Sequence, residues 1–315
     1  MTALPKPVVD AMADRSMRLH HLLWHAARNG WAGMTPAEQQ IFRDHGWEPP
    51  RPGLTAAGDP EMDNGSGEDF LYMHREMIAD VDDILARLGD PQYPRVEGWP
   101  AVPAPDDPDY PVPPDFDIPG APGLTGAIRN AKTDASLDQL RAWEATSTDP
   151  AVLRQVTLGQ LGAFLEYGIH NRMHLRWSAE MPAYRPNEDP FTIGAQWDDA
   201  RYNWLADPYS AHVNPAFWKL HGWVDARIDD WMAANDLTGP VPWSFDPPWS
   251  GPMEHGEHDH HPVAGPSLRA HALDAETFEL VEPQLRAMEA TVRDLRRAGV
   301  PEPPPLPVVT GLTLG

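Results

Sequence analysis

Apolar residues recur every three or four positions along most of this 315-residue chain, with polar residues between them. This spacing puts apolar side chains on one face of an α-helix, whereas a half-buried strand would alternate at every second position. Strand-like alternation is scarce, so the pattern predicts a mostly α fold. The predicted helices span residues 7–29, 67–88, 215–235 and 274–297, with shorter ones opening at Ser136 and Asp149.

Residues at the ends of these segments are typical of helix caps. Thr35 and Glu38 have the spacing of a capping box, with Pro36 at the first helical position. Gly30 and Gly89 follow the first two long segments, and glycine commonly ends a helix because it adopts the left-handed conformation at no steric cost. The sequence therefore predicts both the helices and several of their ends.

The 37 prolines gather in segments that cannot be helix or central strand and that predict long surface connections. They divide the chain into a helical domain with a proline-rich insertion, a proline- and histidine-rich loop, a C-terminal helix packed on the core, and a tail. These parts are residues 1–240 (insertion 91–123), 241–270, 271–299 and 300–315.

The charge balance is strongly acidic. The chain has 24 Lys and Arg against 47 Asp and Glu, a formal net charge of −23, and such a surface repels nucleic acids and anionic membranes. No stretch approaches 18 consecutive apolar residues and no apolar leader follows Met1, so we expect a soluble, cytoplasmic protein. There are no cysteines, which excludes disulfides and thiolate metal ligands.

Two pairs of histidines stand four residues apart within predicted helices, and each pair is followed by a third histidine in the motif Phe-x-x-(Met/Leu)-His. Residues four apart share one helical face, so both imidazoles of a pair can reach one metal ion. Two sets of three suit a binuclear site with three imidazoles per metal. They are His21, His25 and His74 in the first set and His170, His174 and His221 in the second.

Ligand chemistry favours copper for such a site. Imidazole binds copper, zinc, iron and nickel, and copper has the highest affinity of the divalent series. A di-iron carboxylate bundle would need paired Glu-x-x-His motifs, and a zinc protease would need His-Glu-x-x-His; neither is found at useful positions. Zinc stays open as the alternative metal.

The histidine segments resemble those of the type-3 copper proteins, which include tyrosinases, catechol oxidases and hemocyanins. Residues 167–174, Tyr-Gly-Ile-His-Asn-Arg-Met-His, look like the copper-B motif of bacterial tyrosinases, and residues 214–225 resemble the segment that carries the third copper-B ligand. The first set is more similar to the hemocyanin and phenoloxidase branch. The resemblance covers scattered segments between residues 16 and 235.

This resemblance implies a central four-helix bundle that holds two copper ions, wrapped by the proline-rich loops. The first histidine set would bind copper A and the second copper B. It implies a copper-dependent oxidase or monooxygenase that uses O2 on a small aromatic substrate, a phenol, catechol or aminophenol. A hemocyanin-like reversible O2-binding protein and a non-redox helical zinc-binding protein are the alternatives.

The resemblance also points to catalytic residues. Asn171 follows the first copper-B ligand, where the family uses an asparagine with a nearby acid to hold or activate a water. Glu166, one turn before His170, is the nearest acid and therefore the candidate base. The acid of the family lies farther upstream, where this chain has Leu161 or Gln155, so a solvent-facing role for Glu166 is equally expected.

Two further assignments stay open in the sequence. Asp225, one turn after His221, is a candidate to orient that imidazole, or else an ordinary surface acid. His20 would replace His21 as a ligand if the helix were rotated.

A separate histidine cluster lies in the proline- and glycine-rich loop and consists of His255, His258, His260 and His261. Short histidine-rich tracts often bind metal weakly, and we favour that interpretation over a relay of copper to the site. A separate partner that delivers copper is compatible with the site; the sequence contains no signal for the oligomeric state.

Overall fold

A computed structural model describes residues 4–314 apart from 186–190, 192, 253–274, 304, 305, 308 and 310. The protein is mostly helical, at 56% helix, and the part described contains no strand beyond a single bridge between Leu54 and Pro60. The mostly α fold class is therefore confirmed. The histidine cluster at 255–261 lies outside the described residues.

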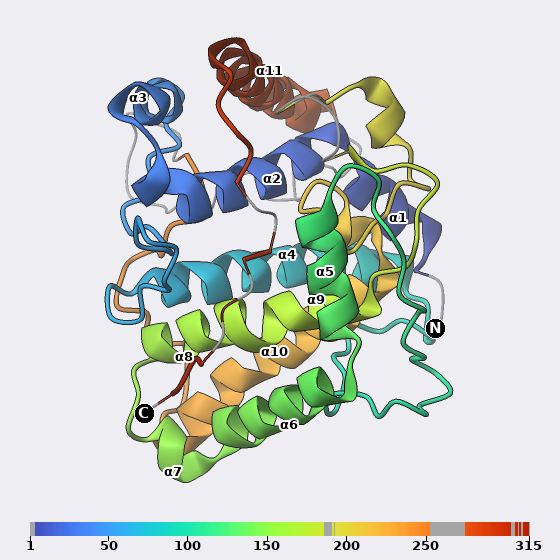
Figure 1. Ribbon diagram of the computed structural model, residues 1–315, viewed down its shortest axis with the longest axis vertical. Helices are drawn as coiled ribbons and strands as arrows, with labels where there is room; N and C mark the ends of the chain where they lie inside the picture. The colour runs from blue at the N-terminus through green and yellow to red at the C-terminus, as the bar shows by residue number, and fades with distance from the viewer. Residues whose placement is uncertain are drawn as a thin grey trace.

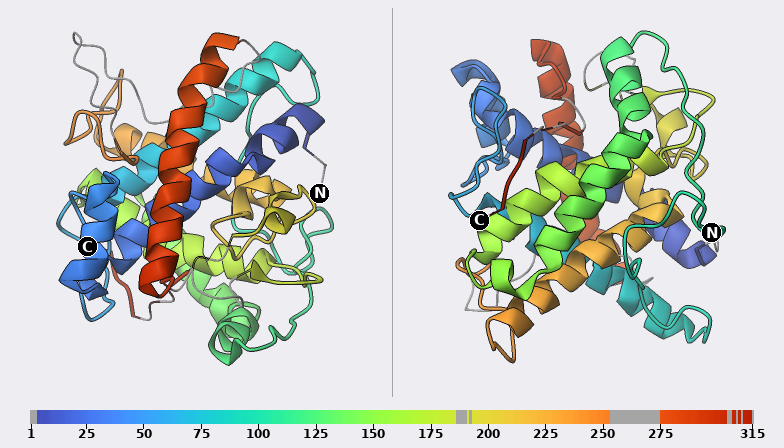
Figure 2. Two further views of the ribbon diagram at one scale, coloured as in Figure 1. Left: turned by 90° about the horizontal axis from the view of Figure 1, so that it is seen from above. Right: turned by 60° about the horizontal axis from the view of Figure 1, so that its bottom comes forward.

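The helices follow one another in this order: α1 (Lys6–Ala13), α2 (Arg15–Gly30), η1 (Trp31–Gly33), α3 (Pro36–Asp44), α4 (Ser66–Leu88), α5 (Pro122–Ala131), α6 (Asp134–Thr148), α7 (Pro150–Leu153), α8 (Leu158–Phe164), η2 (Leu165–His170), α9 (Asn171–Trp177), η4 (Ala195–Asp198), η5 (Ala211–Val213), α10 (Pro215–Ala234) and α11 (Ala275–Ala298). Figure 1 shows α2, α4, α8 and α10 crossing the molecule one below another, with α6 beneath them. α11 lies across α2 and packs on α2 and α3 (Figure 2).

Two predicted helices are interrupted. The segment 7–29 is two helices, because Asp14 adopts an extended backbone (φ −59°, ψ 139°) and its carboxylate accepts from the Ser16 N–H as the N-cap of α2. The segment that opens at Asp149 breaks after α7, and a capping box of Thr157 and Gln160 starts α8. From Leu158 to Trp177 the chain is then continuously helical, with the wider π-helical turns of η2 in its middle.

Other sequence predictions are confirmed. Thr35 and Glu38 form the reciprocal capping box of α3, and Gly89 ends α4 with a φ of 64°. The C-terminal helix buries Met288, Val292 and Leu295 against the core. No helix in the described parts of the chain is long and apolar enough to cross a membrane.

α4 and α8 cross with their backbones in contact. A Cβ atom added at Gly67 would lie 2.0 Å from the Gly159 carbonyl oxygen and 2.2 Å from the Ala163 nitrogen. Only a residue without a side chain allows this approach, since interhelical distances are normally about 8–10 Å. The crossing lies about two turns before His74 on α4 and about two turns before His170 on the other rod, so it sets the relative height of these two histidines.

We expect Gly67→Ala to destabilise the protein by about 1–3 kcal/mol or more, because the added methyl group meets rigid backbone. The matched control is Gly126→Ala on the exposed side of α5, where a Cβ meets nothing within 4 Å. That change should be neutral or stabilising by about 0.5–1 kcal/mol, the helical preference of alanine over glycine. Chemical denaturation measures both; equal effects would contradict the backbone contact.

Candidate metal centre

The six predicted histidines come together from separate parts of the chain and are all buried, with at most 7% of each side chain exposed. Helix α2 carries His21 and His25, α4 carries His74, the η2–α9 rod carries His170 and His174, and α10 carries His221. The helices therefore bring both predicted sets into one interior region.

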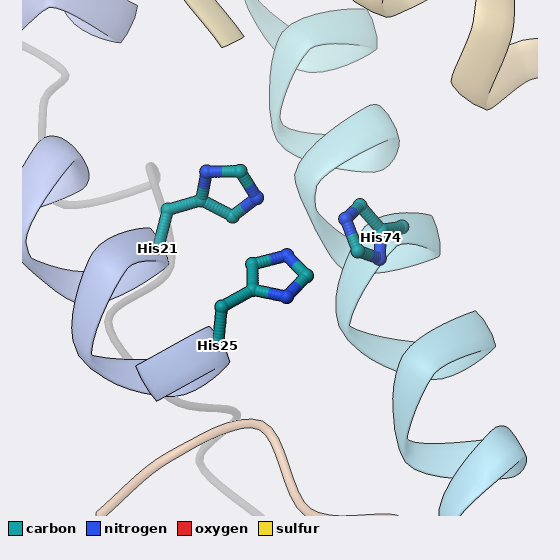
Figure 3. A group of neighbouring side chains, drawn as sticks. All are labelled: His21, His25 and His74. Carbon is teal, nitrogen blue, oxygen red and sulfur yellow. The ribbon is translucent and has the colours of Figure 1, made fainter. Parts of the chain in front are cut away.

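The first set is assembled as predicted. One ring nitrogen from each of His21, His25 and His74 lies within 4.8 Å of the others. Figure 3 shows the two rings of α2 facing the ring of α4 across the space between the helices. The Nε2 atoms of His21 and His74 are buried and have no hydrogen-bond partner among the described residues, and the same is true of the Nδ1 atom of His25.

In the second set, His170 lies close to both other members, but His170, His174 and His221 do not form a trio of ring nitrogens within 4.8 Å of one another. The Nε2 atom of His170 lies 3.0 Å from the Nε2 atom of His221 and 3.0 Å from that of His174. His74 also joins this group: its ring stacks on His221 with centroids 4.4 Å apart, and His74, His170 and His221 form a second trio of ring nitrogens within 4.8 Å. The two groups are therefore contiguous, with His74 between them.

The repeated Phe-x-x-(Met/Leu)-His motif has a physical role. His74 Nδ1 donates to the Phe70 carbonyl at 2.9 Å, and His221 Nδ1 donates to the Phe217 carbonyl at 2.8 Å. Each phenylalanine ring also packs on its histidine, with Phe217 and His221 centroids 3.6 Å apart. The helix thus supplies both the acceptor and the apolar wall for its own histidine.

Three other histidines find their Nδ1 acceptors elsewhere. His21 donates to the Pro208 carbonyl and His174 to the Leu205 carbonyl, both at 2.6 Å. His170 donates to the Asn171 side-chain oxygen at 2.9 Å. A carbonyl or amide oxygen can only accept, so in five of the six rings the proton sits on Nδ1 and the Nε2 lone pair is free.

The Nε2 lone pair of His170 thus faces those of His174 and His221, each at 3.0 Å, and none of the three nitrogens carries a proton. Burial lowers the pKa of His174 to about 4 and that of His21 to about 3, and it holds the pKa of His170 and His221 well below the usual range. Protonation near neutral pH is therefore disfavoured. The donor set fits a metal cation instead, and the buried trios could hold one.

The structure decides between His20 and His21. The His20 ring faces Trp47, with centroids 5.5 Å apart, and bonds to the backbone of Ser250, away from the other histidines. His21 points to His25 and His74, so His21 is the member of the first set.

The predicted orientation of His221 by Asp225 is wrong. Asp225 pairs with Arg75, with nitrogen–oxygen distances of 2.6 and 3.2 Å. The Nδ1 position of His221 is occupied by the Phe217 carbonyl of its own helix. Asp225 is one turn after His221 on the same helix, which made it the simplest expected partner. The Phe217 carbonyl, one turn before His221, accepts the Nδ1 proton instead.

Glu166 has a different partner from the one its predicted role requires. Its two oxygens accept from Arg28 at 2.7 and 3.0 Å, and both side chains are fully buried. Glu166 lies within the π-helical turns of η2, and the ion pair connects this element to α2. Burial raises the pKa of Glu166 against the opposing effect of Arg28. Its contacts give no support to a role as base.

Asn171 contacts both its neighbour His170 and the tail of the chain. Its side-chain oxygen accepts from His170, and its amide nitrogen donates to the Pro307 carbonyl at 2.8 Å. This pair of bonds fixes the amide orientation, so the tail of the chain holds Asn171 and Asn171 holds His170.

Sequence reasoning missed another buried histidine, His212, and the loop that carries it. The Nδ1 atom of His212 lies 3.1 Å from that of His21, and its Nε2 atom has no partner among the residues the structure describes. His212 follows Leu205 and Pro208 in one irregular segment. No helical spacing links it to another histidine, and backbone carbonyls have no sequence signature, so no pattern pointed to this segment.

A small pocket borders the first set. Leu22, His25, Ala26 and Asn29 of α2 line it, together with Pro208 and the tail residues Glu302 and Pro303. Its volume of about 10 Å³ is close to what one water molecule needs. The pocket therefore has room for about one water-sized molecule on the His25 side of the first set.

Comparisons of the whole chain with protein-family models and with curated protein sequences find no match.

We expect His21→Ala to weaken metal binding more than about 100-fold, since even outer partners of a metal ligand are worth about 10–100-fold. His20→Ala should stay within about threefold of the unchanged protein, because that ring faces Trp47. Competition between the protein and a chelator for Cu(II) or Zn(II) measures both affinities. Equal losses, or the reverse order, would mean that the other face of α2 carries the ligand.

We expect Glu166→Gln to lower the free energy of unfolding by about 3–5 kcal/mol, because it leaves Arg28 as an unpaired buried charge. The double change Arg28→Met with Glu166→Leu removes both charges and should recover most of that loss. Urea denaturation measures the three proteins. A stable Glu166→Gln protein would contradict a structural role for the pair.

Proposed function

We propose that this chain binds two copper ions through its six converging histidines and acts as a type-3-copper-like oxidase on ortho-diphenols or aminophenols with O2. One observation carries the proposal: imidazole lone pairs from four helical segments meet in the buried interior, and in five of the six rings the proton is held on the far side. An all-imidazole donor set without carboxylate suits copper among the common metals. When bound, the copper pair would supply the electrons that reduce O2.

The residues of the chain would set the conditions for that chemistry. The Nδ1 bonds hold each imidazole neutral and aimed, which removes the cost of ordering the ligands when metal binds. Phe70 and Phe217 pack against the rings and exclude water. Exclusion of water strengthens every electrostatic interaction inside the site.

The choice of substrate follows from the contacts of the two predicted catalytic residues, Glu166 and Asn171. Hydroxylation of a monophenol needs an acceptor for the phenolic proton, whereas a diphenol or aminophenol is oxidised with a smaller demand for one. Glu166 is committed to Arg28, and Asn171 is committed to His170 and Pro307. We therefore favour diphenols and aminophenols over monophenols.

The size of the pocket beside His25 favours a second candidate, a reversible O2-binding protein. A space for one water-sized molecule accommodates O2 without any movement of the chain. The two candidates share the metal site and differ in whether an aromatic ring can reach it.

Copper reconstitution tests the proposal. We expect about two copper ions per chain by elemental analysis, an absorption band that depends on O2, and turnover of catechol or 2-aminophenol at least about tenfold faster than of a matched monophenol. An O2-dependent band without turnover would favour the O2-binding candidate. Zinc retained against excess copper, or one metal ion per chain, would rule out both copper candidates.

A further inference from the structure

Two of the histidines are oriented by the same short segment, residues 204–213, which we call the orienting loop. His174 donates through Nδ1 to the Leu205 carbonyl and His21 donates through Nδ1 to the Pro208 carbonyl, each at 2.6 Å. The acceptors are three residues apart in the chain. One loop therefore sets the ring direction of one histidine in each metal-binding group.

Asp207, between these two acceptors, holds the loop in shape. Its fully buried carboxylate accepts from Arg185 Nε at 2.9 Å and Nη2 at 2.7 Å, from the Tyr202 hydroxyl at 2.7 Å and from the Tyr209 N–H at 3.1 Å. Its backbone carbonyl accepts from the N–H groups of the next turn, at Ser210 and Ala211. Four hydrogen bonds to the Asp207 carboxylate thus hold the loop on both sides of this residue, where the Leu205 and Pro208 carbonyls lie.

Arg185 is held in turn by the tail. Its two terminal nitrogens donate to Glu302 at 2.9 and 2.6 Å, and its side chain is 1% exposed. The loop is therefore tied to a buried cation that is itself fixed on two sides.

We propose that Asp207 is a positioning residue for both metal-binding groups, acting through the Leu205 and Pro208 carbonyls on His174 and His21. The negative charge is essential, because an amide in its place would turn two donor hydrogens toward Arg185, Tyr202 or the Tyr209 N–H. His74 and His221 serve as a reference within the same protein. Their Nδ1 atoms donate to carbonyls of their own helices, so their orientation does not depend on the loop.

The test uses the metal-free full chain, so its result does not depend on which metal the protein binds or on its activity. Nitrogen-15 labelling of the histidines lets NMR report the tautomer and the exchange rate of each Nδ1 proton, with single histidine substitutions for assignment. In Asp207→Asn we expect Nδ1 protons of His21 and His174 to exchange about tenfold faster or more, as for weakened hydrogen bonds to fixed acceptors. Those of His74 and His221 should not change.

Two further variants complete the design. Tyr202→Phe removes one donor to Asp207, so the Nδ1 protons of His21 and His174 should again exchange faster, by a smaller factor. This variant tests the proposal if Asp207→Asn fails to fold. Asp225→Asn is the matched control, because it breaks the ion pair between Asp225 of α10 and Arg75 of α4, and this pair has no hydrogen bond to the orienting loop or to a histidine. The Nδ1 signals of all four histidines should stay unchanged.

An additional measurement tests the consequence for metal binding. Zn(II) affinity of Asp207→Asn should fall about 10–100-fold, the usual cost of losing an outer partner of a metal ligand, while Asp225→Asn binds as the unchanged protein does. The proposal is overturned if all four histidine signals change together in the two loop variants, or if those of His21 and His174 stay unchanged. Failure of the copper proposal would leave the NMR result as it is.

Discussion

Nitrogen lone pairs that face one another at 3.0 Å in a buried interior repel, and a shared cation would turn that repulsion into attraction. Protonation does not supply this cation near neutral pH, because burial holds the histidine pKa values far below neutrality. Without a cation the arrangement therefore costs stability. Packing, together with Nδ1 hydrogen bonds in five of the six rings, holds the histidines in place despite that cost.

Two sets of buried charges meet the same requirement for a partner. Arg28 pairs with Glu166, and Arg185 pairs with Asp207 and Glu302. These carboxylates are bound to arginines, and the close groups of ligand atoms found among the described residues contain histidines alone. A carboxylate held by an arginine does not compete with imidazole for a cation.

Sequence periodicity was sufficient to predict the helical class and all six histidines, because both depend on local spacing. The i, i+4 pairs and the Phe-x-x-(Met/Leu)-His motif each act within one helix, and the Phe217 to His221 bond shows why the spacing recurs. The choice between His20 and His21 could not be made, since neighbouring positions on a helix differ only in what the rest of the fold places beside them.

Other features depend on contacts that no local pattern records. The partner of Glu166 is 138 residues away in the chain, so no local spacing points to Arg28. The carbonyls of Leu205 and Pro208 act through backbone atoms that every residue has, so only the folded chain shows that they orient His174 and His21. Long-range and backbone-mediated interactions are therefore where the sequence-based prediction of this site fails.

Arg185 connects two properties of the site that would otherwise be independent. Through Asp207 it stabilises the loop that aims the histidines, and through Glu302 it holds the tail residue that closes the pocket beside His25. Glu302 and Pro303 line this pocket together with Pro208, whose carbonyl accepts from His21. Arg185 therefore joins the wall of the pocket to the loop that aims His21 through one buried guanidinium. The alignment of the ligands and the wall beside His25 thus depend on the same ion-pair network.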